Sequence, residues 1–344
     1  MNFLFPDRWA ALAAQYPERT MGRITLREKG GYRIRTSMGE QNALVSGKFQ
    51  FDAQSPSDYP AVGDYVMVSY ADPDTAVIHQ VLPRRSLFVR RAAGTSKMEQ
   101  VVAANIDTVF LCMSLNNDFN LRRLERYLAA TWESGAAPVV VLTKADLCED
   151  VSSKQAEVET ITMGVPILTT SAMDTDGYGQ IMPYITEGRT VAFVGSSGVG
   201  KSTLSNCLLG EERLATDGLR NDDKGRHTTT HRELLVLPNG AMVIDTPGMR
   251  ELGMWDAAPG VEQTFTDIEA LAAQCRFRNC SHTSEPGCAV RAAIRSGELD
   301  SGRWRSYQKL KNENSYAGDS ERYLAAKEKK FKEISKINKY HKKR

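Results

Sequence analysis

A chain of 344 residues is longer than one core usually supports, which predicts two or three domains. Its 41% hydrophobic and 25% charged residues, with a net charge of +2, are typical of a soluble globular protein. No run of about 18 apolar residues offers a membrane span. The N-terminal segment lacks a signal-peptide core, so we expect a cytoplasmic protein without a membrane partner.

The N-terminal part of the chain predicts a helix followed by a small β-barrel. Residues 6–16 form a candidate helix with Trp9 and Leu12 on one side. Between Thr20 and Leu82, short β-like segments alternate with glycine turns. Five such strands are typical of an OB-type barrel, although an SH3-like barrel has a similar pattern. The five segments cover residues 22–26, 32–35, 43–45, 64–68 and 77–81.

The barrel sequence interleaves basic and aromatic residues. We expect its surface to hold Arg23, Arg27, Lys29, Arg33, Arg35 and Lys48 near Tyr32, Phe49 and Phe51. Cations bind phosphates and rings stack on bases, so such a surface is typical of single-stranded nucleic-acid binding. The alternative is that the rings belong to the barrel core and the arginines are only solvated.

Alternating strand and helix patterns follow and predict a mostly parallel α/β domain. An amphipathic helix is expected over residues 121–133, ended by Gly135, and a hairpin across Pro238-Asn239-Gly240. The expected strands cover residues 106–113, 138–142, 165–169, 191–194, 234–237 and 241–244.

The strand at 191–194 runs into Gly195-Ser196-Ser197-Gly198-Val199-Gly200-Lys201-Ser202, which matches the phosphate-loop pattern G-x-x-x-x-G-K-[ST]. Glycines let successive N–H groups and the N-terminus of the next helix converge on phosphate oxygens. Lys201 is expected to meet the β- and γ-phosphates, and Ser202 to ligate Mg²⁺. With the following Thr203, this motif predicts a nucleotide site.

Two further stretches fit the γ-phosphate side of such a site. Asp245-Thr246-Pro247-Gly248 follows an apolar run and matches D-x-x-G, in which the Asp reaches Mg²⁺ through water and the glycine N–H senses the γ-phosphate. The polar segment 216–232 holds Thr228, Thr229 and Thr230, one of which is expected to ligate Mg²⁺ in a switch loop. Thr229 is our candidate, although spacing alone does not choose among the three.

Guanine recognition is predicted by Thr143-Lys144-Ala145-Asp146, a match to [NT]-K-x-D at the end of the strand at 138–142. The Asp146 carboxylate can accept N1–H and N2–H₂ of guanine while the Lys144 stem covers the base. Adenine offers no such donor pair, so the motif favours GTP over ATP. Thr170-Ser171-Ala172 fits the loop whose backbone N–H approaches guanine O6.

The motif order is a circular permutation of the ordinary GTPase order, because the guanine motifs precede the phosphate loop and D-x-x-G comes last. Such a permutation preserves the sheet where the old termini lie close in space. It places the segment after Gly248 directly before the C-terminal region.

A metal site is predicted by Cys275, Cys280, His282 and Cys288, three thiolates and an imidazole suited to tetrahedral Zn²⁺. No fifth ligand stands out, which favours a closed structural site. The alternative is a set of buried or redox cysteines.

Helices are expected after the metal ligands, at residues 289–296, 303–312 and 322–339. The last segment, 321–344, holds eight Lys and two Arg against three Glu, a net charge of +7. This tail is either a basic arm for an anionic partner or a solvated helix face.

On these motifs and on Gly225-Arg226-His227-Thr228-Thr229-Thr230, the chain resembles the ribosome small-subunit-dependent GTPase A family of circularly permuted GTPases. The resemblance implies GTP hydrolysis stimulated by the 30S subunit, a role in its late maturation, and rRNA contacts through the barrel and zinc domains. Thr143 departs from the family's usual Asn. Met249 stands where many GTPases carry a water-orienting glutamine, and the family's proposed substitute corresponds to His227.

We therefore expect an OB-fold barrel in residues 1–95, a permuted α/β P-loop GTPase domain in 96–256 and a helical zinc-binding domain in 257–344. The expected ligands are GTP or GDP with Mg²⁺ and one structural Zn²⁺, and the expected partners of the monomer are the 30S subunit and its 16S rRNA. Two rival functions stay open: an RNA-binding assembly scaffold that uses GTP as a structural ligand, and an ATP-dependent P-loop enzyme such as a kinase.

Overall fold

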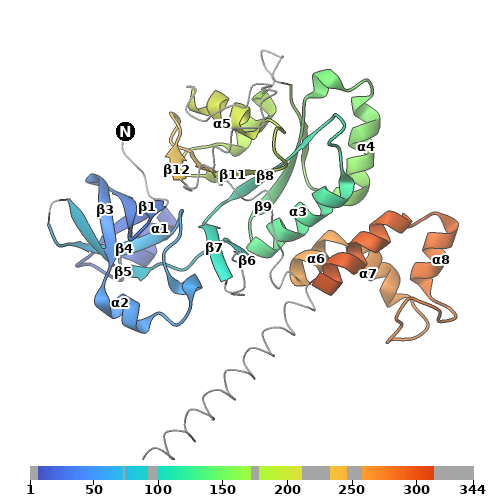
Figure 1. The fold of residues 1–344 in the computed structure, drawn as a ribbon, viewed down its shortest axis with the longest axis horizontal. Helices are drawn as coiled ribbons and strands as arrows, with labels where there is room; N and C mark the ends of the chain where they lie inside the picture. The colour runs from blue at the N-terminus through green and yellow to red at the C-terminus, as the bar shows by residue number, and fades with distance from the viewer. Residues whose placement is uncertain are drawn as a thin grey trace, which may run out of the picture. The chain divides into compact units, whose positions relative to one another are not determined.

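A computed structural model divides the chain into two compact units, Met1–Gly253 and Met254–Arg344 (Figure 1). The residues that it describes are 7–72, 74–91, 99–171, 178–210, 233–245 and 258–313. The predictions for Ala172, the switch segment 216–232, Gly248 and the basic tail lie outside these residues.

The first unit begins with a closed five-stranded barrel. Its strands are β1 (Thr20–Glu28), β2 (Gly31–Thr36), β3 (Gly39–Val45), β4 (Tyr65–Tyr70) and β5 (Thr75–Val81). They follow the order β1-β2-β3-β5-β4, and β4 pairs back with β1 to close the barrel. Only β3 and β5 pair in parallel. Fully buried side chains such as Ile24, Ile34 and Ile78 fill the interior. The predicted OB-type barrel is confirmed.

Short helices attach to this barrel. They are α1 (Asp7–Ala13), α2 (Gly47–Asp52) and the 3₁₀ turn η1 (Pro56–Asp58). Trp9 on α1 is buried and stacks on Tyr65 with 4.4 Å between ring centroids, which confirms the predicted apolar side of this helix. The Ser46 hydroxyl caps α2 by accepting a hydrogen bond from the Phe49 N–H.

The predicted basic surface of the barrel is wrong at two positions. Arg23 is 0% exposed and Tyr32 is only 8% exposed, so neither residue lies on the surface. All of residues 22–26 in β1 are buried, because one side of this strand faces the barrel interior and the other packs against the next domain. Arg27, Lys29 and Lys48 are exposed as expected, and Phe51 is 89% exposed.

Arg23 lies at the joint between the barrel and the second sheet. Its guanidinium donates to Thr190 Oγ1 at 2.7 Å, to Met242 Sδ at 2.8 Å, to the Gly63 carbonyl at 3.3 Å and to the Asn105 carbonyl at 3.4 Å. It also lies over the ring of Tyr65, 4.6 Å from the centroid. A buried cation thus connects the barrel to the first residues of two strands of the next domain.

That domain is an α/β sheet with the strand order β10-β9-β8-β11-β13-β12. Its strands are β8 (Thr108–Ser114), β9 (Ala137–Thr143), β10 (Ile167–Thr169), β11 (Thr190–Val194), β12 (Glu233–Val236) and β13 (Met242–Asp245). All neighbours pair in parallel except the predicted β12–β13 hairpin. β12 also pairs with β1 at Leu26 and Glu233, so barrel and sheet are continuous. A hairpin of β6 (Leu87–Arg91) and β7 (Glu99–Ala104), which sequence reasoning did not anticipate, precedes β8.

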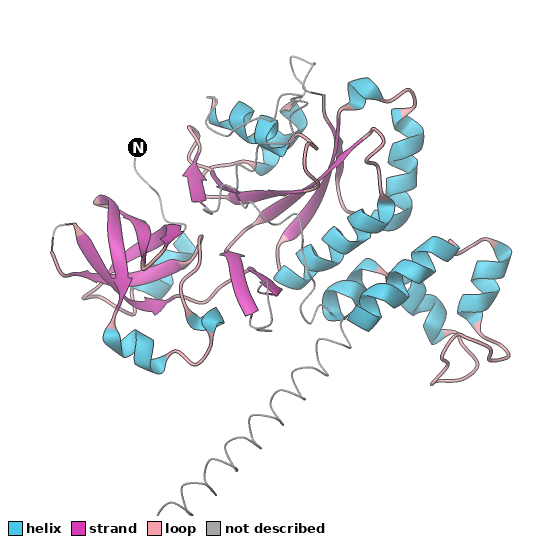
Figure 2. Ribbon diagram, in the orientation of Figure 1, coloured by secondary structure: helices cyan, strands magenta, loops and turns pink. Residues whose placement is uncertain are grey.

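Helices flank this sheet, as Figure 2 shows. They are α3 (Leu121–Ser134), α4 (Val151–Thr162), α5 (Lys201–Leu209) and the 3₁₀ turns η2 (Ala145–Leu147) and η3 (Gly179–Tyr184). α3 begins at the Asn120 cap and ends at Gly135, whose φ of +82° requires the left-handed region. Apolar side chains of the sheet form two buried clusters, one with α3 and α4 and one with α5 and η3.

The second unit is helical in the described residues. It contains α6 (Ala258–Thr264), α7 (Thr266–Ala273), α8 (Ala289–Ser296) and a further helix at 301–313. Buried Arg303 donates to both carboxylate oxygens of Asp267, at 2.7 and 2.8 Å, and to the Thr264 carbonyl at 3.0 Å. The bidentate pair with Asp267 joins the helix at 301–313 to α7, and the bond to Thr264 joins it to α6. Among the described helices, none is both long and apolar enough to cross a membrane.

Candidate nucleotide and metal sites

The predicted nucleotide motifs meet at one edge of the parallel sheet. β9 ends at Thr143, β10 at Thr169, β11 at Val194 and β13 at Asp245. Parallel neighbours carry their carboxyl ends to the same edge, which is where open α/β sheets bind ligands. Segments that are far apart in sequence therefore come together, although the side chain of Asp245 and all of Gly248 lie outside what the structure describes.

The phosphate loop follows β11 in the backbone conformation that its glycines permit. Gly198 has φ of +71° and Gly200 has φ of +105°, both in the left-handed region. A Cβ on Gly195 would lie 2.5 Å from the Cys112 carbonyl oxygen, so only glycine fits where the loop crosses β8. The Lys201 ammonium donates to the carbonyls of Gly195 at 2.8 Å and Ser196 at 2.5 Å. These two bonds hold the amine against the loop.

The loop that follows β8, which sequence reasoning missed, contacts the phosphate loop. The Ser196 hydroxyl donates to the Asp118 carboxylate, and Asp118 forms an ion pair with Arg123 at 2.9 Å. The Asn116 side chain accepts from the Ser114 hydroxyl at 2.8 Å and from the Asp118 N–H at 3.1 Å, which fixes the turn. The polar run after the apolar strand β8 was the available sequence signal, because buried strands are followed by ligand loops at this edge.

The guanine motif contacts the phosphate loop directly. The buried Thr143 hydroxyl donates to the Val199 carbonyl at 2.7 Å, across 56 positions of sequence. The Ser171 hydroxyl donates to Asp146 Oδ1 at 2.6 Å. Lys144 has φ of +58°, in the left-handed region, where the chain turns from β9 into η2. The structure therefore brings together Thr143, Asp146, Ser171 and the phosphate loop.

We expect Thr143→Val to weaken GTP binding about tenfold, because the Val199 carbonyl would lose its buried donor and the loop its tie to β9. Thr143→Ser keeps the hydroxyl and should stay near wild type. Titration with a fluorescent GTP analogue measures both, and equal affinities for the valine and serine variants would show that the hydroxyl has no such role.

Cys112 lies beside the phosphate loop at Gly195. It is buried on β8, and burial raises its pKa to about 12, against a smaller opposing effect of the Lys201 charge. A thiol with this pKa is neutral near pH 7, so Cys112 serves packing rather than nucleophilic chemistry.

The four predicted metal ligands of the second unit form one cluster. The ligand atoms of Cys275, Cys280, His282 and Cys288 all lie within 4.8 Å of one another. Cys275 Sγ lies 3.9 Å from Cys288 Sγ, and His282 Nδ1 lies 3.5 Å from each of these sulfurs. A tetrahedral zinc site with Zn–S of about 2.3 Å and Zn–N of about 2.0 Å has edges of roughly 3.8 and 3.5 Å. The three edges among Cys275, His282 and Cys288 therefore match these lengths.

The loop around these ligands is held from both sides. Glu285 accepts hydrogen bonds from the hydroxyl and N–H of Ser281, which lower the pKa of its carboxyl to about 2, and it also accepts from the N–H of Thr283. His282 has φ of +60° and packs edge-on against Trp304, with 5.5 Å between centroids. Cys288 also caps α8 through its sulfur, which accepts from the Arg291 N–H at 3.5 Å. Hydrogen bonds and ring packing thus help to position the loop that carries the four ligands.

An OB-type barrel, a phosphate loop and a guanine motif on one sheet edge, in permuted order, define a circularly permuted P-loop GTPase with a cysteine-rich helical domain. A family profile described as RsgA GTPase matches residues 81–255. The chain belongs to the RsgA GTPase family and is a GTP hydrolase, as the sequence predicted.

Named relatives extend this similarity to most of the chain. It is 53% identical over 305 residues to "Small ribosomal subunit biogenesis GTPase RsgA 2" of Lactiplantibacillus plantarum, covering 88% of this chain and 86% of the relative. It is 49% identical over 306 residues to the RsgA of Opitutus terrae, covering 86% and 83%. Among solved structures, YjeQ from Thermotoga maritima is similar with a TM-score of 0.64 and 27% identity, covering 86% of this chain and 98% of that one.

Proposed function

We propose that this GTPase acts in late maturation of the small (30S) ribosomal subunit, binding the subunit as a cytoplasmic monomer and hydrolysing GTP there. Relatives with up to 53% identity are named small ribosomal subunit biogenesis GTPases. The observation that carries the nucleotide part is the hydrogen bond from Thr143 to Val199, which joins the guanine motif to the phosphate loop. The exposed cations Arg27 and Lys48 of the barrel support a contact with 16S rRNA.

The motif residues receive the following roles in this proposal. Asp146 and Lys144 hold guanine, with Ser171 and Ala172 beside it. The backbone of the phosphate loop and Lys201 hold the phosphates. Mg²⁺ would be held by Ser202, Thr229 and, through water, Asp245, and it would neutralise charge on the phosphates. Gly248 senses the γ-phosphate and His227 orients the attacking water, a task for which Met249 has no polar group.

Small subunits are expected to accelerate hydrolysis strongly, because the isolated chain lacks a water-orienting glutamine after Gly248. The test is the GTPase rate with and without purified 30S subunits, repeated on a chain truncated before Glu321 to remove the basic tail. Fast hydrolysis by the isolated protein, with no increase on adding subunits, would contradict the proposal. His227→Ala should abolish the stimulated rate while leaving GTP affinity unchanged.

Zinc is the metal that we propose for the cysteine–histidine cluster, on the basis of its edge lengths and its Cys₃His donor set. We expect metal analysis of the purified chain to find about one Zn²⁺ per molecule, and Cys280→Ser to lose it together with helical signal from the second unit. Cys207→Ser, which changes an exposed cysteine outside the cluster, is the matched control. A metal-free chain with a fully folded second unit would refute the assignment.

A further inference from the structure

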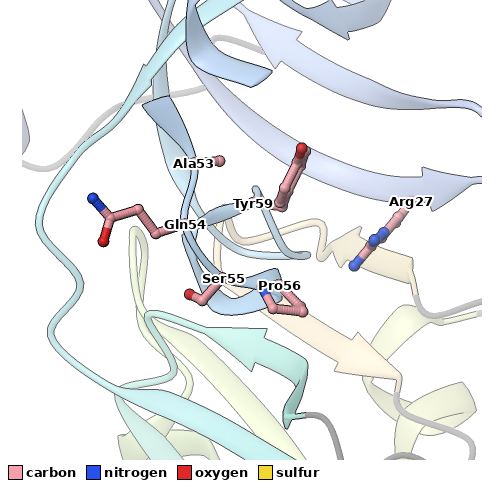
Figure 3. A pocket seen from close by; sticks show the side chains of 6 residues that line it. All are labelled: Arg27, Ala53, Gln54, Ser55, Pro56 and Tyr59. Carbon is pink, nitrogen blue, oxygen red and sulfur yellow. The ribbon is translucent and has the colours of Figure 1, made fainter. Parts of the chain in front are cut away.

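A hollow of about 350 Å³ lies on the barrel, separate from the sheet edge that carries the GTPase motifs. One wall is Arg27, near the end of β1, and the rest comes from the connection between α2 and β4. The lining residues are Arg27, Ala53, Gln54, Ser55, Pro56 and Tyr59. Figure 3 shows the Arg27 side chain extending from β1 toward Pro56 and Tyr59.

Hydrogen bonds to Asp58 and from Arg84 hold the connection that lines this hollow. Asp58 accepts hydrogen bonds from the N–H groups of Gln54 and Ser55, both at 2.8 Å, and these bonds lower the pKa of its carboxyl. Arg84 donates to the carbonyls of Ser57 at 2.6 Å and Tyr59 at 2.9 Å. Its guanidinium is itself paired with a fully buried carboxylate, Asp64, at 2.7 Å.

The hydrogen bonds of Asp58 and Arg84 thus order an exposed segment that has only one turn of 3₁₀ helix. Ordering a loop in advance removes an entropic cost that a ligand would otherwise have to offset. The lining of the hollow is therefore held by contacts within the protein, as is usual for ligand pockets.

The lining chemistry combines a ring, a cation and an amide. Tyr59 is held by an edge contact with Phe49, with centroids 5.8 Å apart, and Pro56 adds a second flat surface. Arg27 is exposed, and within the described part of the chain no carboxylate pairs with it. Gln54 also lines the hollow, and Figure 3 shows its side-chain amide directed away from Arg27. Phe51, only two residues before the lining begins, is 89% exposed.

We propose that this hollow binds one unpaired nucleotide of an RNA strand. The base lies against Tyr59 and Pro56, and Arg27 binds the phosphate. Bases in a duplex are stacked on their neighbours and cannot enter, so the site is selective for single-stranded segments. The inference deepens the proposed ribosomal role by naming the chemistry of one contact, and it rests on that role only for the source of the RNA.

The test is fluorescence anisotropy of the full chain with a short labelled RNA that lacks guanosine, in the presence of saturating GDP and Mg²⁺ to occupy the guanine site. Arg27→Gln and Tyr59→Leu should each weaken binding of the single strand about tenfold. The matched controls are Lys29→Gln, which removes the same charge from an exposed neighbour outside the hollow, and Tyr59→Phe, which keeps the ring. Both controls should stay within about twofold of wild type.

Several results would overturn the proposal. Equal losses for Arg27→Gln and Lys29→Gln would mean diffuse attraction of phosphates without a site. Equal affinity for the single strand and for its duplex would exclude base insertion. Uridine or cytidine monophosphate binding as tightly as the strand would assign the hollow to free nucleotides. Unfolding midpoints and basal GTP hydrolysis of each variant confirm that the fold is intact.

The ribosomal role is measured separately, as stimulation of wild-type GTP hydrolysis by small subunits. Stimulation without selective single-strand binding would refute the hollow alone. Selective binding without stimulation would leave the hollow supported and refute the coupling to the ribosome.

Discussion

Exchanging Asp146 for asparagine is expected to lower the affinity for GTP about 100-fold and to raise the affinity for xanthosine triphosphate. The Asp146 carboxylate accepts from the Ser171 hydroxyl at 2.6 Å, and an acidic acceptor there matches the two donors of guanine. Asparagine presents one acceptor and one donor, which leaves a guanine donor unpaired but suits the additional carbonyl of xanthine. Two charge-assisted hydrogen bonds of about 1.5 kcal/mol each correspond to roughly this factor of 100.

Competition titrations with GTP, ATP and xanthosine triphosphate measure this change on wild type and variant. Ser171→Ala is the control, because it removes only the hydroxyl that supports the carboxylate and should cost less than about tenfold. A variant that keeps its preference for GTP would show that Asp146 does not read the base. That result would reopen the choice among nucleotides, since the guanine assignment of this chain depends on this side chain.

Replacing Arg23 by methionine is expected to lower the free energy of unfolding of the first unit by about 2–4 kcal/mol. Two effects oppose each other here. Removing a fully buried charge relieves its desolvation cost, which alone would stabilise the fold. The net change in the free energy of unfolding is expected to be a loss. The Thr190 hydroxyl oxygen and the Asn105 carbonyl both lose a charged donor where they are buried. The Gly63 carbonyl suffers less, since it also accepts from Asn105 Nδ2 at 3.1 Å.

Urea unfolding followed by circular dichroism measures this loss as a shift of the midpoint. Arg27→Met on the same strand is the control, and it should change stability by less than about 0.5 kcal/mol because Arg27 is exposed. Arg23→Lys should restore little, since a single ammonium cannot reach the acceptors that a planar guanidinium reaches together. An Arg23→Met variant as stable as wild type would mean that the joint is held by apolar packing alone.

The contacts of Arg23 connect the barrel to two strands that lead to the GTPase site. Thr190 begins β11, which leads into the phosphate loop, and Met242 begins β13, which ends at Asp245. Gly63 adds a second close approach, because a Cβ there would lie 2.1 Å from the Ala104 carbonyl oxygen. The barrel thus packs closely on the β6–β7 hairpin at Gly63, and Arg23 holds the starts of two of the strands whose ends carry the nucleotide motifs.

Much of this protein is encoded in short stretches of sequence. The conformation of a phosphate loop depends on glycines at fixed spacing. The motif alone is therefore enough to predict the left-handed backbone of Gly198 and Gly200. The same holds for the helix end at Gly135, for the β12–β13 hairpin, and for the four metal ligands, which lie within fourteen residues. In each case the determining interactions are local, and neighbouring residues are enough to specify the backbone.

Tertiary structure alone decided which side chains are buried and which distant groups meet. Arg23 has the sequence neighbours of a surface arginine, and only the packing of β1 against a second domain makes it a buried cation. The contacts of Thr143 with Val199 and of Ser196 with Asp118 span 56 and 78 positions, beyond the reach of any local pattern. Local sequence determines backbone geometry because the forces involved act within a few residues. Burial and long-range hydrogen bonds depend on how complete elements pack, which no single stretch of the chain specifies.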